Sequence, residues 1–414
     1  MSEWKEYKLG DVCTELSDGL HKAPKFKMGG DYIFVNAKNI VDGFIVDNDP
    51  TKKSTHEEYL KYASPLNDTS ILYSIDGTIG NVALYRGEKC ILGKGACYMN
   101  PNPEILDRMF LYYELQSPRF KSYIYKMSTG STIKHISLKT MRGYNFTFPS
   151  LEIQRQLSSI LYSLDNKIAV NKKICENLEA QAQVLFKHWF VDFAPFRDGK
   201  LVESELGLIP EGWRVVSLDE MTSKFGTGLN PRQNFKLGEG DNYYVTIKNM
   251  GNNRVYLDDR CDKVTDDAIE KINKRSKLQK GDLLFSGIGT IGRVAMITET
   301  PQNWNTSESV FNMHPAEGYS TEFLYVLLLS DVFQQYVKIH AQGGVQQGIR
   351  MASLKQYQMA VPDYNTIKSF DDIIVPIISQ IREKDKENDC LATLRDTLLP
   401  KLMSGEIKVK DIKL

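Results

Sequence analysis

Two stretches of the chain combine basic and amide side chains without an acidic residue, a composition suited to binding a polyanion. The first lies between Glu114 and Glu152, and the second between Asp331 and Asp363. Their basic and amide residues include Arg119, Lys121, Lys126, Lys134, His135, Lys139 and Arg142 in the first, and Lys338, His340, Gln346, Gln347, Arg350 and Lys355 in the second. Because cations neutralise phosphates while guanidinium and amide groups hydrogen-bond base edges, the pattern indicates two nucleic-acid-binding surfaces. The alternative is two acid-poor hairpins that bind nothing.

Motifs that would support catalysis are incomplete. The run from Gly87 to Gly95 is one residue too long for a nucleotide-binding loop and has Gly95 where a Mg²⁺-binding Ser or Thr belongs. Asn100-Pro101-Asn102-Pro103 departs from the Asn-Pro-Pro-aromatic loop of adenine methyltransferases. The Glu-x-Lys sequence that a metal-dependent nuclease would need occurs as Glu406-Ile407-Lys408, but it lies in the terminal tail, far beyond Asp363, and is more simply a coincidence. We therefore expect a binding protein with no catalytic residue, metal site or cofactor of its own.

The composition of the whole chain excludes several classes of protein. The 414 residues carry 52 Lys+Arg and 52 Asp+Glu, so bulk charge cannot hold the chain on nucleic acid, although a local basic face is still compatible with these counts. The six cysteines form no C-x-x-C pair, which argues against zinc and for reduced thiols in the cytoplasm. The sequence contains no apolar run of the roughly 18 residues that a membrane span needs. At about 150 residues per domain, the length predicts two to three domains.

The chain repeats itself with a period of about 210 residues. Similar segments are residues 32–40 and 243–250, 71–83 and 283–295, and 133–139 and 349–355. The second pair shares Gly-Thr-Ile-Gly, which opens no clear helix and therefore indicates a tight turn rather than a phosphate loop. The period is too long for a solenoid and predicts a duplicated, pseudo-two-fold chain with two related binding surfaces.

Helical periodicity follows each copy. Apolar residues recur at three- and four-residue steps from Ile153 to Trp189 without Gly or Pro, which predicts a helix of about 36 residues, roughly 54 Å long. A less regular stripe runs from Ile367 to Leu402, where Pro376 predicts a kink or a helix start. Two such stripes favour an antiparallel coiled coil. Shorter helices are expected around residues 106–116 and 322–330.

The patterns together predict an α+β fold. Two duplicated β-rich mixed α/β domains are separated by two long antiparallel helices that form a coiled coil. The expected boundaries are a first domain at 1–150, a helical spacer at 151–190, an extended connector at 191–212, a second domain at 213–362 and a helical spacer at 363–414. The paired helices would act as a ruler between the domains.

Over essentially its full length the chain resembles the specificity (S) subunit of type I restriction-modification systems. The motifs that carry the resemblance are Asp18-Gly19-Leu20-His21-Lys22-Ala23-Pro24, the repeated Gly-Thr-Ile-Gly, residues 185–193 at the exit of the first helix, residues 207–213 and residues 398–407. The chain departs from the family at the Pro-x-x-Glu-Gln that often follows each domain, which is degenerate after Pro362.

The resemblance implies two target-recognition domains that each read one half of a bipartite double-stranded DNA target, with a helical spacer that sets the unread gap. It also implies docking of two methyltransferase subunits, which bring S-adenosylmethionine for adenine methylation, and of two ATP- and Mg-dependent restriction subunits. This chain would then catalyse nothing and contact no membrane. Two alternatives remain open, namely a stand-alone DNA methyltransferase or nuclease and a symmetric scaffold that binds only protein.

The candidate DNA-binding residues carry cationic or hydrogen-bonding side chains on the repeated segments. They are His21, Lys22, Lys38, Asn39, Thr78, Lys134 and His135 in the first domain, and Asn230, Arg232, Lys248, Asn249, Thr290, Arg293, Gln346, Gln347 and Arg350 in the second. The alternative for each is an ordinary solvated side chain. We assign the aromatic residues Phe186, Trp189 and Phe190 to helix packing or subunit docking.

Overall fold

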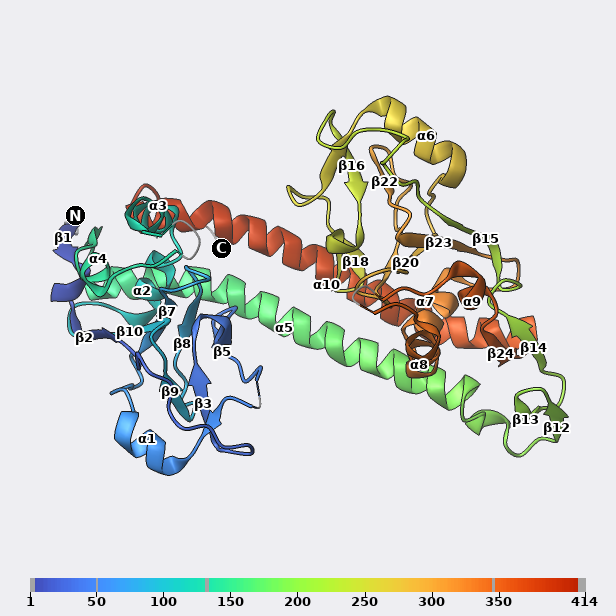
Figure 1. The fold of residues 1–414 in the computed structure, drawn as a ribbon, viewed down its shortest axis with the longest axis horizontal. Coiled ribbons are helices and arrows are strands. Elements are labelled where there is room, and N and C mark those ends of the chain that lie inside the picture. The colour runs from blue at the N-terminus through green and yellow to red at the C-terminus, as the bar shows by residue number, and fades with distance from the viewer. Residues whose placement is uncertain (1–3, 50, 131–133, 345–346, 409–414) are drawn as a thin grey trace. The chain divides into compact units, whose positions relative to one another are not determined.

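The computed structural model describes residues 4–49, 51–130, 134–344 and 347–408 and divides into two compact units. Unit 1 comprises Met1–Asn171 with Lys386–Leu414, and unit 2 comprises Lys172–Asp385. Two long helices, α5 (Leu151–Phe190) and α10 (Tyr364–Ser404), contribute a part to each unit (Figure 1). None of the helices in the described ranges is long and apolar enough to cross a membrane.

Unit 1 is built on two small sheets. The first is antiparallel with the order β2-β10-β7-β8, formed by β2 (Cys13–Asp18), β10 (Ala96–Pro101), β7 (Ile71–Ser74) and β8 (Val82–Leu84). The second has the order β6-β3-β9, formed by β6 (Lys53–Ser54), β3 (Tyr32–Val35) and β9 (Cys90–Leu92), with β3 and β9 parallel. Two short pairs are β1 (Lys5–Lys8) with β11 (Asn145–Phe148) and β4 (Ile40–Val41) with β5 (Phe44–Ile45). Its helices besides those parts of α5 and α10 are α1 (His56–Tyr62), α2 (Arg108–Glu114), α3 (Pro118–Met127) and α4 (Leu138–Arg142).

The central strand β7 of unit 1 is buried on both faces. Because side chains alternate along a strand, Ile71 and Tyr73 face one core with Phe120, while Leu72 faces another with Val35. This double burial explains why the strand sequence is continuously apolar rather than alternating.

Unit 2 repeats this topology element by element. Its four-stranded antiparallel sheet has the order β15-β23-β20-β21, formed by β15 (Thr222–Thr227), β23 (Val310–Pro315), β20 (Leu283–Ser286) and β21 (Val294–Met296). The three-stranded sheet β19-β16-β22 is formed by β19 (Asp262–Val264), β16 (Asn242–Val245) and β22 (Trp304–Thr306). Two short pairs are β14 (Arg214–Ser217) with β24 (Gln358–Val361) and β17 (Met250–Gly251) with β18 (Arg254–Val255). Its short helices are α6 (Asp266–Ser276), α7 (Thr321–Leu329), α8 (Asp331–His340) and α9 (Met351–Lys355). The predicted duplication is therefore confirmed, as are the short helices that became α2 and α7.

The long helices pack in antiparallel directions within each unit. In unit 1, the apolar side chains of Leu157 and Leu161 on α5 join the same core as Leu399 and Leu402 on α10. The Asp165 carboxylate lies 2.8 Å from the Arg395 guanidinium, and the Lys167 ammonium lies 3.4 Å from the Glu387 carboxylate. Residue numbers therefore rise along α5 where they fall along α10, which means that the helices are antiparallel. In unit 2, Cys175 donates to the carbonyl of Ile381 in the same sense. The predicted antiparallel packing is thus present.

The second long helix does not start at Pro376. It begins at Tyr364, where the carboxylate of Asp363 accepts hydrogen bonds from the backbone N–H groups of Asn365 and Thr366 and caps the helix. Buried Ile374 and Ile378 flank the exposed proline. Their burial offsets the backbone hydrogen bond that proline cannot make.

Two other expectations are corrected. The connector is not simply extended, because β12 (Leu201–Ser204) and β13 (Gly207–Pro210) form an antiparallel hairpin whose Gly207 adopts a φ of +94°.

The similarity of residues 133–139 to 349–355 is displaced by three positions. Ile136 matches Ile349, because their N–H groups donate to the equivalent carbonyls of Ile75 and Gly287. A chance match of Ser-Leu-Lys in the two segments caused the displacement.

Candidate nucleic-acid interface

The Gly-Thr-Ile-Gly element forms the same tight turn in both units. In unit 1 the N–H of Gly80 donates to the Ser74 carbonyl, and the Ser74 hydroxyl accepts from the Asn81 N–H. In unit 2 the N–H of Gly292 donates to the Ser286 carbonyl, and the Ser286 hydroxyl accepts from the Arg293 N–H. The Gly80 and Gly292 φ values of +107° and +91° suit glycine. Thr78 and Thr290 lie exposed at the two turns.

Each turn is joined to the acid-free stretch of its own unit. The Gly77 N–H donates to the Lys134 carbonyl at 3.2 Å, and the Ile136 N–H donates to the Ile75 carbonyl at 2.9 Å. In unit 2 the Gly289 N–H donates to the Gln347 carbonyl at 2.7 Å, and the Ile349 N–H donates to the Gly287 carbonyl at 2.8 Å. We call this arrangement the turn–loop surface, formed by residues 75–81 with 134–136 in unit 1 and by residues 287–293 with 347–349 in unit 2.

The turn–loop surfaces bring together candidates that are far apart in the sequence. In unit 1 they are Thr78, Lys134 and His135, with the Lys134 ammonium 4.5 Å from the centre of the Tyr125 ring. In unit 2 they are Thr290 and Gln347, with exposed Arg350 one residue beyond the surface. Gln346 lies outside the described residues.

The loop that follows β2 in unit 1 and the loop that follows β15 in unit 2 are called the opening loops. The first lies against the connection between β9 and β10, and the second lies against the connection between β22 and β23. Leu20 exchanges backbone hydrogen bonds with Leu92 and Lys94, which places His21 and Lys22 beside that connection. A Cβ atom at Gly19 would lie 2.1 Å from the Leu92 backbone, and one at Gly228 would lie 1.7 Å from the Thr306 carbonyl. Glycine is required at both positions, so the loops are equivalent.

The polar candidates on these opening loops are accessible to differing degrees. His21 is 69% exposed and lies 3.2 Å from the Asp18 carboxylate. Lys22 and Arg232 are exposed, and Asn230 is half-buried. These four side chains are thus at the surface, as a contact to DNA would require.

Asn39 and Asn249 are caps rather than free amides. Each is buried, and its side-chain oxygen accepts a backbone N–H at the start of a short 3-10 helix, from Asn36 at 3.0 Å and from Thr246 at 2.9 Å. The Asn39 amide also donates to the Val46 carbonyl at 3.1 Å. Neither side chain is accessible to DNA in this structure, so neither Asn39 nor Asn249 is proposed as a DNA contact.

The two lysines beside these caps form ion pairs at the surface. Lys38 lies 3.1 Å from the Asp49 carboxylate, and Lys248 lies 3.0 Å from the Asp262 carboxylate. Hydrogen bonds from Thr51 and from Lys38 hold the pKa of Asp49 at about 2. A phosphate contact by either lysine would have to compete with its carboxylate.

Several arginines of the two units serve the fold. Arg119 lies 2.7 Å from the carboxylate of the fully buried Glu114, and Arg142 donates to the Leu16 carbonyl at 2.6 Å. The half-buried Arg293 guanidinium donates to the Ile247 carbonyl at 3.0 Å and also to the Met250 carbonyl. Arg293 therefore tethers the capped loop, as Asn81 does in unit 1 by donating to the Ile40 carbonyl.

The aromatic residues at the exit of α5 are part of the core of unit 2. Phe186 is 1% and Phe190 is 4% exposed, and both rings pack on Phe323 and Phe370. Trp189 is half-buried and also contacts Phe370. The structure thus places these rings in core packing, and subunit docking by Phe186, Trp189 and Phe190 stays a prediction.

Sequence reasoning missed Asp76 and Lys94 in unit 1. The Asp76 carboxylate lies 4.0 Å from His135 and 3.9 Å from Lys94. The signal was present in the repeat itself, since Asp76 stands where the second copy has Ile288. A position that differs inside an otherwise matched turn is a candidate for different recognition.

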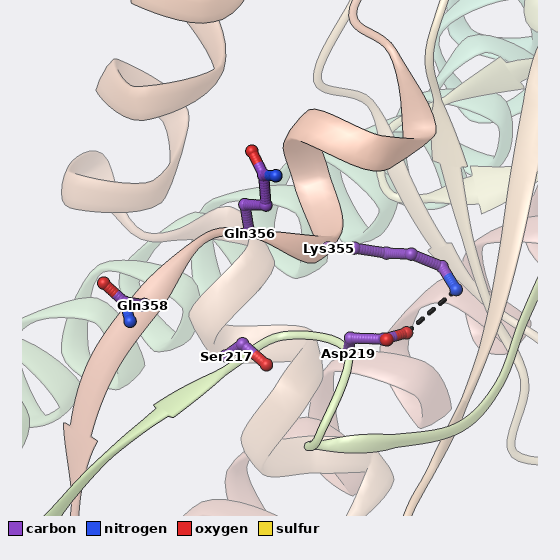
Figure 2. Close-up of a pocket in the computed structure, with 5 residues that line it drawn as sticks. All are labelled: Ser217, Asp219, Lys355, Gln356 and Gln358. Atoms are coloured by element: carbon purple, nitrogen blue, oxygen red, sulfur yellow. Dashed lines mark ion pairs between the residues drawn. The ribbon is translucent and has the colours of Figure 1, made fainter.

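A polar pocket lies at the C-terminal end of α9. Figure 2 shows its lining residues, which are Ser217, Asp219, Lys355, Gln356 and Gln358. The Lys355 ammonium and the Asp219 carboxylate are 2.9 Å apart, so they satisfy each other. The pocket contains none of the candidate residues. Among the described residues, no group of three His, Cys, Asp or Glu side chains could hold a metal ion.

Comparison with known proteins agrees with the repeated fold. A family model described as the type I restriction modification DNA specificity domain matches residues 1–180 and 210–391. The HindI specificity subunit of Haemophilus influenzae is 25% identical, with 98% of this chain and 100% of that protein covered. The MjaIX specificity subunit of Methanocaldococcus jannaschii is 23% identical, with coverage of 99% and 95%. The crystal structure of the S subunit from M. genitalium has the same fold, with a TM-score of 0.54, 18% identity and coverage of 97% and 96%. With two matched domains over most of its length, the chain belongs to the family of type I restriction-modification specificity subunits.

Proposed function

We propose that each turn–loop surface reads one half of a split double-stranded DNA target. The observation that carries this proposal is one backbone frame with two different sets of side chains. Unit 1 presents Lys134 and His135 where unit 2 presents Gln347 and Gly348. Because base readout depends on donor and acceptor patterns, different sets on one frame select different sequences.

The surrounding residues would hold the duplex in place. Exposed Lys22 and Arg232 on the opening loops are suited to phosphates, which fix register without carrying sequence information. Zero net charge of the chain implies weak affinity for DNA alone, so partners would strengthen binding. We take the recognition domains to be residues 1–150 and 213–362, with helical spacers at 151–190 and 363–414 and a connector at 191–212.

The helices α5 and α10 would set the length of the unread gap, since both continue from one unit into the other. The chain would dock two methyltransferase subunits, which bring S-adenosylmethionine, and two restriction subunits, which use ATP and Mg²⁺. Catalysis would reside in those partners, because the turn–loop surfaces offer hydrogen-bonding and cationic groups without a nucleophile–base pair.

Mapping of methylated adenines tests this function. Genomic DNA from cells that express the full chain with its partner methyltransferase should carry methyl groups at one split motif of two short sequences around a fixed gap. Cells that express the methyltransferase alone provide the control. Methylation that is absent, unsplit or independent of this chain would contradict the proposal.

A further inference from the structure

The first turn–loop surface holds one carboxylate, with a histidine and a lysine beside it. Asp76 directly precedes Gly-Thr-Ile-Gly, and its side chain is 30% exposed. One carboxylate oxygen lies 4.0 Å from Nδ1 of His135, and the other lies 3.9 Å from Nζ of Lys94. The carboxylate therefore occupies the surface that we propose to face DNA.

The fold does not require this carboxylate. In unit 2 the same turn closes with the same backbone hydrogen bonds, yet Ile288 replaces Asp76 and Gly348 replaces His135. Glu308 replaces Lys94, because the next residue along the chain accepts an equivalent hydrogen bond in each unit. The Gly95 carbonyl accepts from the Ile75 N–H, and the Ser309 carbonyl accepts from the Gly287 N–H. The carboxylate and the Lys94 and His135 side chains beside it are thus particular to unit 1.

A carboxylate beside DNA cannot bind phosphate, because both groups are negatively charged. Its partner must therefore be another group of the DNA. The carboxylate can only accept hydrogen bonds, and the donors in the major groove are the amino groups of cytosine and adenine. Cytosine presents its amino group there without an acceptor, whereas adenine places N7 beside its amino group and would repel the second carboxylate oxygen. The Lys94 ammonium, 3.9 Å from the carboxylate, would offset the repulsion from neighbouring phosphates.

We propose that Asp76 determines specificity in unit 1 by accepting a hydrogen bond from the amino group of a cytosine in the major groove. This inference rests on the proposed function, because it assigns one position of the half-site that unit 1 would read. It predicts that one half of the methylated motif contains an obligatory C·G pair that depends on Asp76.

Asp76→Asn tests the inference, because the amide has nearly the same shape and unit 2 shows that the turn tolerates an uncharged residue. The full chain and its partner methyltransferase are expressed together, and genomic adenine methylation is mapped. We expect roughly tenfold lower discrimination at one C·G position, with the other half-site unchanged. Asp76→Glu should retain more of the preference for cytosine.

Glu57→Gln provides the matched control, since it removes the same charge from an exposed position of unit 1 on α1, outside the turn–loop surface. Its motif should equal that of the wild type. A split motif that stays unchanged in Asp76→Asn, or that has no C·G pair in either half, would overturn the role of Asp76 and leave the proposed function standing. A wild-type chain that directs no split motif would overturn both.

Discussion

The side-chain amide of Asn171 donates a hydrogen bond to the side-chain oxygen of Asn388 at 3.0 Å, inside the helix pair of unit 1. Both residues are buried, with exposures of 0% and 8%. A shift of one helix along the other would separate the two amides of this polar layer and remove this hydrogen bond. Such layers fix the register of paired helices at some cost in stability.

The first prediction concerns this polar layer. Asn388→Leu should lower the free energy of unfolding by about 1–3 kcal/mol, because the Asn171 amide loses its partner. The double substitution Asn171→Leu with Asn388→Leu should restore or exceed wild-type stability, as buried polar pairs replaced by apolar ones often do. Urea unfolding measures both. Asn166→Leu, at an exposed position of α5, should change stability by less than about 0.5 kcal/mol. Equal effects of Asn388→Leu and the control would contradict a register role.

The buried Glu114 carboxylate of unit 1 depends on Arg119. Burial raises the pKa of Glu114, and hydrogen bonds from Arg119, Tyr144 and Ser117 lower it in part. Arg119→Ala should cost about 3 kcal/mol near neutral pH, the low end for broken buried pairs, because the Arg119 side chain is 37% exposed.

The cost of Arg119→Ala should also depend on pH. Without the guanidinium the folded-state pKa of Glu114 rises further above its unfolded value, so the folded state binds more protons than the unfolded state. Stability of the variant relative to wild type then falls as pH rises. Urea unfolding at pH 5 and pH 8 should show the larger loss at pH 8. Arg155→Ala, at an exposed position whose guanidinium lies 4.0 Å from Asp107, serves as control. A loss that is independent of pH would contradict this account.

These two pairs show where sequence reasoning succeeds and where it stops. Periodicity identified α5 and the antiparallel packing, because an apolar stripe of that length has few other ways to be buried. The acid-free stretches were real, but their residue types did not reveal that Glu114 at the border of the first stretch folds back onto Arg119. Likewise, the repeated Lys-Asn pairs suggested DNA contacts, whereas tertiary structure uses Asn39 and Asn249 as buried caps. Residues that are repeated in both units are those that the shared fold requires. Positions that differ between the units, such as Asp76 and Ile288, are the candidates for recognising different DNA sequences.

A third prediction distinguishes a DNA contact from surface charge. Arg350 lies directly after the turn–loop surface of unit 2, whereas Lys280 lies before the opposite end of β20. Arg350→Ala in the complex with its partner methyltransferase should weaken DNA binding and reduce the slope of log affinity against log salt by about one if the contact is to phosphate. Lys280→Ala should change neither quantity. Fluorescence anisotropy across a salt titration measures both. Unchanged affinity of the Arg350 variant would remove this residue from the interface.

A fourth prediction separates a cap from a reading residue. Asn249→Ala should destabilise unit 2 by about 1–2 kcal/mol, because the Thr246 N–H loses its acceptor at the start of the 3-10 helix. Where the variant folds, its methylation motif should be unchanged. Thr290→Val should behave in the opposite way, with near-wild-type stability and an altered half-site, because its side chain is exposed on the turn. Thermal unfolding and methylation mapping of both variants decide the matter, and an altered motif in Asn249→Ala would contradict the assignment as a cap.

The last prediction uses the close approach of the opening loop in unit 2. A Cβ atom at Gly228 would lie 1.7 Å from the Thr306 carbonyl and 2.9 Å from that of Ser307. These are backbone atoms of the connection that leads into β23, so they cannot rotate away as a side chain would. Gly228→Ala should therefore cost about 3 kcal/mol or more.

The damage from Gly228→Ala should be confined to one half of the target. Gly344→Ala, where nothing lies within 4 Å of the added atom, is the control and should leave stability unchanged. Because unit 1 has its own core, the Gly228 variant should lose discrimination in one half-site while the other half-site is retained. Methylation mapping reports both halves at once, and equal loss in both would mean that the units do not read DNA independently.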